Sequence, residues 1–307
     1  MNDEHEFVTV SKSHPWRWIA GIFSIAVTAW LIFHVGNNDS FHFATVPEFL
    51  LDPRILDGLK LTIYVTCGSM LIGLVLGVVL AIMGLSANPV TNIIASAFIW
   101  LFRGTPVLVQ LIFWFNIGII FPNLSLSLPG GNVLFSMPMN TIMTAVVTAL
   151  IGLGLNEAAY MSEIVRAGIQ SIDKGQVEAA KALGLPPFKV MARIVFPQAM
   201  RLIVPPIGNQ FISLLKTSSL VSVISAGDLL TQATRIYSEN FRILELLVVA
   251  SIWYLVLTTI ANVGQWFIER RYSRDLHAEK SNRWRSALNV LRPSFRKSNA
   301  SSAERLQ

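Results

Sequence analysis

Ionisable side chains lie inside the long apolar runs of this chain, where hydrocarbon would surround a helix. Arg103 interrupts one run, and Glu157 and Glu163 interrupt another. A charged side chain at the centre of a membrane helix costs about 2.5–3.5 kcal/mol on insertion scales, so each is a functional hypothesis by default. The carboxylates either pair with Arg103 or Arg166 or attract the ammonium group of a substrate.

Amide and phenol groups accompany these carboxylates. At 100° per residue, Tyr160 and Glu163 lie about 40° and about 20° from Asn156 on a helix, and Glu157 lies about 100° away. The four side chains therefore form one polar arc. Glu163 lies near the cytoplasmic end of its run, which favours a structural role, whereas Glu157 fits a structural ion pair or a substrate contact equally well.

The Gly-Thr-Pro sequence after Arg103 predicts a broken helix, because proline has no backbone N–H to donate. Such a break survives in a membrane only where neighbouring protein or a water-filled cavity satisfies the freed backbone groups. Arg103 lies about 11 residues, or about 16 Å, from the start of its run. It either belongs to a gate or substrate path, or reaches the cytoplasmic interface or a structural ion pair.

A second polar stripe occurs in the run that ends near residue 224. Asn209, Gln210, Ser213, Lys216 and Thr217 fall within about 120° of arc on a helix. The stripe either lines a pathway or forms a helix–helix interface, where such groups hydrogen-bond for about 0.6 kcal/mol each. The residues predicted for a translocation path are Arg103, Thr105, Asn156, Glu157, Tyr160, Glu163, Asn209, Ser213, Lys216 and Thr217.

The elements that must hold these groups are transmembrane helices. Of the 307 residues, 53% are hydrophobic and 14% are charged, whereas soluble domains have about a quarter charged. The runs that reach the roughly 20 apolar residues of a membrane crossing are 18–35, 59–85, 92–121, 140–165, 203–224 and 245–268. We predict an all-α polytopic membrane protein with about six spans, the first an uncleaved anchor rather than a signal peptide. Its single cysteine, Cys67, excludes an internal disulfide.

Basic residues assign the two sides of the membrane. From residue 269 onward, ten basic residues stand against four acidic ones, and such an excess marks the cytoplasmic side. With six spans the N-terminus is cytoplasmic as well, and so is the basic segment 166–202. Because basic residues gather beside apolar runs, the net charge of +6 indicates membrane topology and not nucleic-acid binding.

The cytoplasmic segment predicts two short helices. Ser171 or Asp173 caps the first helix, and Gly184 lies where a left-handed residue ends it. The Pro186-Pro187 pair begins a second helix, which we expect to break at Pro197.

The spacing within this segment resembles a known motif. Glu178-Ala179-Ala180 is followed after three residues by Gly184, and after nine more by Ile194, one residue, and the pair Phe196-Pro197. This pattern resembles the EAA motif of type I importer permeases in ATP-binding-cassette (ABC) transporters, with phenylalanine where leucine is usual before the final proline. In that family the loop forms a coupling helix that enters a groove of a separate ATPase subunit. The resemblance implies the coupling residues Glu178, Ala179, Ala180, Leu183, Gly184, Leu185 and Phe188.

Two more stretches narrow the resemblance. FRGTPVLVQL, residues 102–111, and GNQFISLLKTSSLVSVI, residues 208–224, are similar to the subfamily that imports polar amino acids. The likeness covers about residues 55–270 and suggests three parts. They are an N-terminal cytoplasmic segment with an extra anchor and an external loop (1–54), the type-1 permease domain (55–270), and a basic cytoplasmic tail (271–307). The extra anchor and the tail depart from the shorter family members.

The resemblance also implies partners. These are two ATPase subunits, a substrate-binding protein, and a second copy of the permease or a similar permease, in the cytoplasmic membrane of a bacterium. ATP and Mg²⁺ belong to the ATPase subunit. The sequence has no Gly-x-x-x-x-Gly-Lys-Ser/Thr phosphate loop, so we expect no enzymatic activity and no bound cofactor or metal in this chain.

Two other functions compete with this interpretation. An ion- or proton-driven secondary carrier would use Glu157, Glu163 and Arg103, which explains the buried charges but not the EAA spacing. A membrane-anchored scaffold without transport would tolerate leucine throughout the polar stripes.

Overall fold

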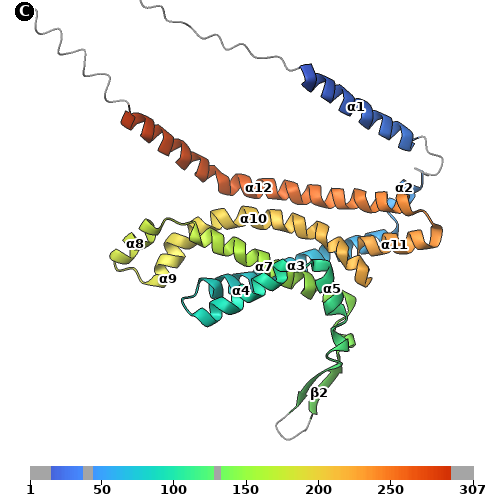
Figure 1. The fold of residues 1–307 in the computed structure, drawn as a ribbon, viewed down its shortest axis with the longest axis horizontal. Coiled ribbons are helices and arrows are strands. Elements are labelled where there is room, and N and C mark those ends of the chain that lie inside the picture. Colours follow the sequence, from blue (N-terminus) through green and yellow to red (C-terminus); the bar gives the residue numbers. More distant parts are fainter. Residues whose placement is uncertain (1–14, 37–43, 128–132, 292–307) are drawn as a thin grey trace, which may run out of the picture.

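The computed structural model describes residues 15–36, 44–127 and 133–291, and its long helices run side by side in one bundle, except for the first helix, which lies apart from it (Figure 1). The predicted all-α membrane architecture is confirmed. In chain order the elements are α1 (Pro15–Gly36), α2 (Thr45–Leu50), α3 (Pro53–Leu85), α4 (Pro89–Gly104), α5 (Val107–Phe115), a 3₁₀ turn (Ile117–Ile119), β1 (Asn123–Ser127), β2 (Val133–Pro138), α6 (Met139–Ile142), α7 (Ala145–Gln170), α8 (Lys174–Ala182), α9 (Pro187–Val190), a π-helical turn (Met191–Val195), α10 (Phe196–Thr217), a 3₁₀ helix (Ser218–Ile224), α11 (Leu229–Asn240) and α12 (Ile243–Leu291).

Four helical stretches are long and apolar enough to cross a membrane, and they are Pro53–Leu85, Ala145–Gln170, Pro187–Ile224 and Ile243–Tyr272. α4 and α5 would make a fifth crossing if this bent pair of helices forms one span. The first predicted span coincides with α1, but its described apolar part, Trp18–Trp30, is shorter than a crossing. The count of six therefore stays a prediction, and residues 1–14 and 292–307, expected to be cytoplasmic, lie outside the described residues.

The predicted sides of the membrane correspond to opposite ends of the bundle. α8 and α9, from the basic segment, lie at one end, and α2 and α11 lie at the other (Figure 1). The fourth span begins at Ala145 and not at residue 140, because the hydroxyl of Thr144 caps α7 by accepting from Val147 N. Residues 139–142 form the separate helix α6.

A β-hairpin is a departure from the all-helical prediction within the described residues. β1 and β2 pair antiparallel, with Leu124 opposite Met137 and Ser125 opposite Ser136. Because side chains alternate across a strand, the apolar pair and the serine pair point to opposite faces. The hairpin projects from the flank of the bundle (Figure 1). The sequence analysis missed this hairpin, although the alternating Leu-Ser-Leu-Ser sequence at residues 124–127 is typical of a β-strand.

The predicted helix break at Pro197 is wrong. The helix runs on from Pro187 to Ile224, with the π-helical turn just before Pro197. Pro197 lies in the first turn of α10, where a missing N–H is tolerated, and the π turn changes the hydrogen-bond register ahead of it.

α3 and α7 form a close helix pair through small residues. Ser69, Gly73 and Gly77 lie four residues apart on the face of α3 that is buried against α7. A Cβ added at Gly77 would lie 2.4 Å from the Cβ of Met161 and 3.0 Å from the carbonyl oxygen of Ala158. This small-x-x-x-small pattern lets two membrane helices approach at backbone distance.

α4 and α5 are separated by a sharp break at Thr105 and Pro106, which bends the pair by 102°. The amide nitrogen of Gln110 on α5 donates to the carbonyl oxygens of Phe102 at 2.9 Å and Thr105 at 3.1 Å. The amide of Asn156 on α7 also donates to Phe102 O, at 2.8 Å. Neighbouring side chains therefore satisfy the freed carbonyls, as the sequence predicted for a broken membrane helix.

We predict that Gly77→Ala destabilises the protein by about 1–3 kcal/mol, because the new methyl group overlaps α7. Gly84→Ala is the matched control on the same helix, since its Cβ would meet only Arg166 Cδ, at 3.9 Å. Thermal unfolding of the detergent-solubilised protein measures both. Equal stability of the two variants would contradict the close contact between α3 and α7.

We also predict that Gln110→Leu destabilises the protein by about 1–3 kcal/mol, because it removes the side-chain donor to Thr105 O, one of the two donors to Phe102 O and the acceptor for the Asn156 amide. Asn116→Leu is the control, since the Asn116 amide also donates to a carbonyl oxygen, that of Ile112, but at an exposed helix end. Thermal unfolding again provides the measurement. If Asn116→Leu lowered the stability as much as Gln110→Leu, the hydrogen bonds of Gln110 at the break would have no special role in stability.

Candidate functional site

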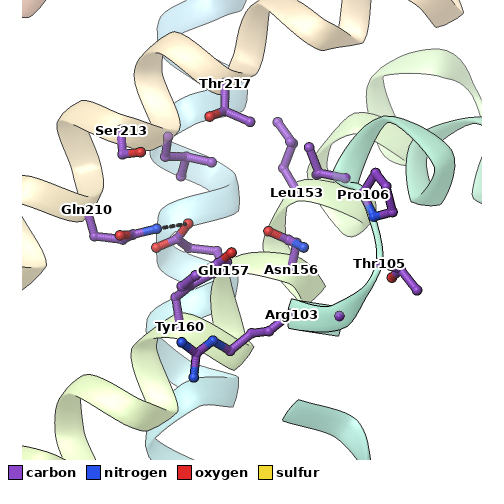
Figure 2. Close-up of a pocket in the computed structure, with 13 residues that line it drawn as sticks. Arg103, Thr105, Pro106, Leu153, Asn156, Glu157, Tyr160, Gln210, Ser213 and Thr217 are labelled. Atoms are coloured by element: carbon purple, nitrogen blue, oxygen red, sulfur yellow. Dashed lines mark hydrogen bonds between the residues drawn. The ribbon is translucent and has the colours of Figure 1, made fainter. Parts of the chain in front are cut away.

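A cavity of about 450 Å³ opens beside the α4–α5 break, between α4, α5, α7 and α10 (Figure 2). Its lining combines charged, hydroxyl, amide and apolar groups. The lining residues are Arg103, Gly104, Thr105, Pro106, Val107, Leu153, Asn156, Glu157, Tyr160, Gln210, Ser213, Leu214 and Thr217.

Seven of the ten residues predicted for a translocation path line this cavity, and they are Arg103, Thr105, Asn156, Glu157, Tyr160, Ser213 and Thr217. On α10 the lining residues Gln210, Ser213 and Thr217 form a narrow stripe at helical spacing. Asn209 and Lys216 are exposed and outside the lining. The 120° arc read from the sequence was therefore wider than the part of α10 that faces the cavity.

Glu157 brings a buried carboxylate to the cavity wall. Its side chain is 3% exposed, and its Oε2 accepts a hydrogen bond from Gln210 Nε2 at 3.2 Å. Its Oε1 has no hydrogen-bond partner among the described residues. A buried carboxylate oxygen without a partner is costly, so a hydrogen-bond donor or a cation close to it would stabilise it.

Arg103 brings the opposite charge to the same cavity. Its guanidinium lies over the ring of Tyr160, 5.2 Å from the centroid, and its Nη1 is 4.0 Å from Glu163 Oε2. Figure 2 shows Arg103 and Tyr160 together on one side of Glu157. The cation–π contact holds the guanidinium without neutralising it.

Asn156 and Thr105 have structural contacts as well as positions in the lining. The Asn156 amide donates to Gln110 Oε1 at 3.2 Å and to Phe102 O. Thr105 Oγ1 accepts from Gln110 Nε2 at 2.8 Å. Gln110 was missed from the sequence, although its place four residues after Pro106 was a signal that it could reach the freed carbonyls.

The cavity lining contains one guanidinium, one carboxylate and several hydroxyl groups. This combination of charges is suited to binding a small zwitterion. No group of three or more His, Cys, Asp or Glu side chains that could hold a metal ion occurs in the part of the chain that the structure describes.

The predicted coupling residues lie together at the α8–α9 end of the bundle, away from the cavity. Gly184 has a left-handed backbone, with φ of 79°. Its N–H bonds Lys181 O, and the N–H of Leu185 bonds Ala180 O, so α8 ends in a Schellman motif. Asp173, one of the two predicted caps, accepts from Gly175 N at the start of α8.

Five of the seven coupling residues are exposed, and they are Glu178, Ala179, Leu183, Gly184 and Phe188. Leu183 is 83% exposed and Phe188 is 80% exposed. Such exposed apolar groups suit an interaction surface. Ala180 is buried and Leu185 packs against the same core, so these two residues attach the loop to the bundle.

Comparison with known proteins agrees with this geometry. The family of binding-protein-dependent transport system inner membrane components matches residues 73–274. The arginine transport system permease protein ArgU of Corynebacterium glutamicum is 44% identical over 262 residues, covering 85% of this chain and 81% of that protein.

Another relative and a solved structure are also similar to this chain. The glutamate/aspartate import permease GltK of Escherichia coli is 37% identical, covering 71% of this chain and 93% of that protein. A crystal structure of an amino acid ABC transporter with histidines matches with a TM-score of 0.64 and 33% identity, covering 75% of this chain and 98% of that one. The chain therefore belongs to the binding-protein-dependent transport system inner membrane components, as a multi-pass permease subunit of an ABC transporter that imports an amino acid.

Proposed function

We propose that this permease carries a cationic amino acid through the cavity between α4, α5, α7 and α10. The substrate α-carboxylate meets Arg103, and an ammonium or guanidinium group meets Glu157. The observation that carries the proposal is the buried Glu157 carboxylate in the cavity lining, whose Oε1 has no hydrogen-bond partner among the described residues. An acidic substrate would add a second negative charge beside Glu157, which disfavours it. The similarity to an arginine transport permease supports the same substrate class.

The α8–α9 loop couples this cavity to ATP hydrolysis in a separate ATPase subunit. The exposed Leu183 and Phe188 provide the docking surface, and the ATPase subunit binds the ATP and Mg²⁺. The loop is oriented toward the cytoplasm, as are both termini, and a substrate-binding protein docks at the opposite end.

The packing of the loop supports coupling by direct contact. Ala180 of α8 and Val190 of α9 share one buried cluster with Val165 of α7 and Ala199 of α10. α7 and α10 also line the cavity, so a displacement of the loop is transmitted to the cavity walls. ATP binding then shifts an equilibrium between two arrangements of these helices.

A second copy of this chain completes the membrane unit. Asn209 and Lys216 are exposed on α10 next to the lining residues. Polar side chains in this position fit a protein partner better than lipid, because charges in lipid are costly.

We predict that Glu157→Gln and Arg103→Gln each raise the KM for arginine at least about tenfold, equivalent to about 1.4 kcal/mol. The measurement is ATP-dependent uptake into proteoliposomes that contain the permease, its ATPase and its binding protein. Ser24→Ala, an exposed side chain on α1 whose hydroxyl bonds only Ala20 O of its own helix, is the control and should leave KM unchanged. Normal KM in both cavity variants would sink the proposed site, and uptake driven by membrane potential without an ATPase would favour a secondary carrier.

We predict that Phe188→Asp prevents co-purification of the ATPase, because it places a charge in an apolar contact, while membrane insertion and thermal stability stay normal. Phe241→Asp is the matched control, since Phe241 is 85% exposed and lies after α11 at the opposite end of the bundle. Retention of the ATPase by Phe188→Asp would show that the α8–α9 surface does not dock it.

A further inference from the structure

Arg103 and Glu157 carry opposite charges on the wall of one cavity, yet they form no ion pair with each other. In a partly desolvated cavity such charges attract strongly. A direct pair would neutralise both groups and occupy the space between them. The structure shows a different arrangement, in which Gln210 bonds Glu157 and the Arg103 guanidinium lies over Tyr160 (Figure 2).

Glu163 provides a second negative charge close to Arg103, outside the lining of the cavity. It is absent from the cavity lining, and its side chain is 29% exposed. Arg166 holds the Glu163 carboxylate with two contacts, Nη2 to Oε2 at 2.7 Å and Nε to Oε1 at 3.3 Å. A fork of this kind fixes the position of a carboxylate. The carboxylate is therefore held in place before Arg103 approaches it.

We propose that Glu163 is a positioning residue, which holds the Arg103 guanidinium on the Tyr160 side and keeps it from pairing with Glu157. The contact between Arg103 and Glu163 is long, at 4.0 Å, because Arg166 already occupies the position closest to the Glu163 carboxylate. A substrate carboxylate can therefore draw Arg103 away from Glu163. This inference rests on the proposed role of the cavity in substrate binding.

Glu163→Gln tests the charge of this residue with little change of shape. The amide no longer attracts Arg103, so Arg103 pairs with Glu157 and competes with the substrate for it. We expect the KM for uptake to rise about fivefold to tenfold, with a smaller change in the maximal rate. Glu163→Asp keeps the charge and should hold KM within about threefold of the unmodified protein. Arg166→Gln, which leaves the Glu163 charge in place, should raise KM less than Glu163→Gln does.

Cavity accessibility provides a readout that needs neither transport nor an ATPase. Cys67 is the single cysteine and is exposed, so Cys67→Ser gives a cysteine-free background for Ser213→Cys in the lining. The labelling rate with a small maleimide reports whether the cavity is open. We expect Glu163→Gln to slow labelling several-fold, and the added Arg103→Gln substitution to restore the rate, because the blocking pair can no longer form.

The outcomes separate this inference from the proposed function. An unchanged labelling rate and unchanged KM in Glu163→Gln would overturn the positioning role, while impaired uptake by Glu157→Gln and Arg103→Gln would still support the substrate site. Slower labelling that Arg103→Gln does not reverse would also overturn it, since a purely structural effect of Glu163 predicts that result. Labelling that is slower in Glu163→Gln and is restored by the added Arg103→Gln substitution would support the positioning role. This would hold even if the Glu157→Gln variant transported arginine normally.

Discussion

The hydrogen bonds at the α4–α5 break are the constraint on which the cavity depends. Pro106 cannot donate a backbone N–H, so the chain must turn here and leave carbonyl oxygens free. Gln110 and Asn156 donate to Phe102 O, and Gln110 also reaches Thr105. These amides stabilise a helix interruption whose free carbonyl groups could not find hydrogen-bond donors in lipid. The 102° bend then leaves room for the cavity and places Arg103 at its edge.

The packing of α7 connects this break to the cavity lining and to the α8–α9 loop. α7 contacts α3 through Gly73 and Gly77, and it also provides Asn156 and Glu157 to the cavity. At its other end α7 packs in the same cluster as Ala180 of the α8–α9 loop. One helix therefore connects the break, the charged lining and the surface proposed for the ATPase. A rigid connection of this kind is required if a movement at the loop is to open or close the cavity.

In the proposed mechanism, the choice of substrate depends on a few cavity side chains and not on the fold. One relative is named for arginine and another for glutamate and aspartate, although both are similar to this chain over most of the permease region. A shared fold can therefore hold sites for opposite side-chain charges. Here Arg103 and Glu157 provide one charge of each sign, and neighbouring groups keep them apart. How these charges are arranged should decide selectivity more than the overall cavity shape does.

The sequence by itself determined the membrane class, most of the spans, the polar arcs, the left-handed Gly184 and the family motif, because each depends on local spacing or composition. Tertiary structure alone decided which polar groups share a cavity. It separated Glu163 and Lys216 from the lining, gave Gln110 its role at the break and carried the helix through Pro197. Helical periodicity assigns a residue to a face of its own helix, but the helix that packs against that face is set by contacts between distant residues. The bond from Asn156 to Phe102 is one such contact.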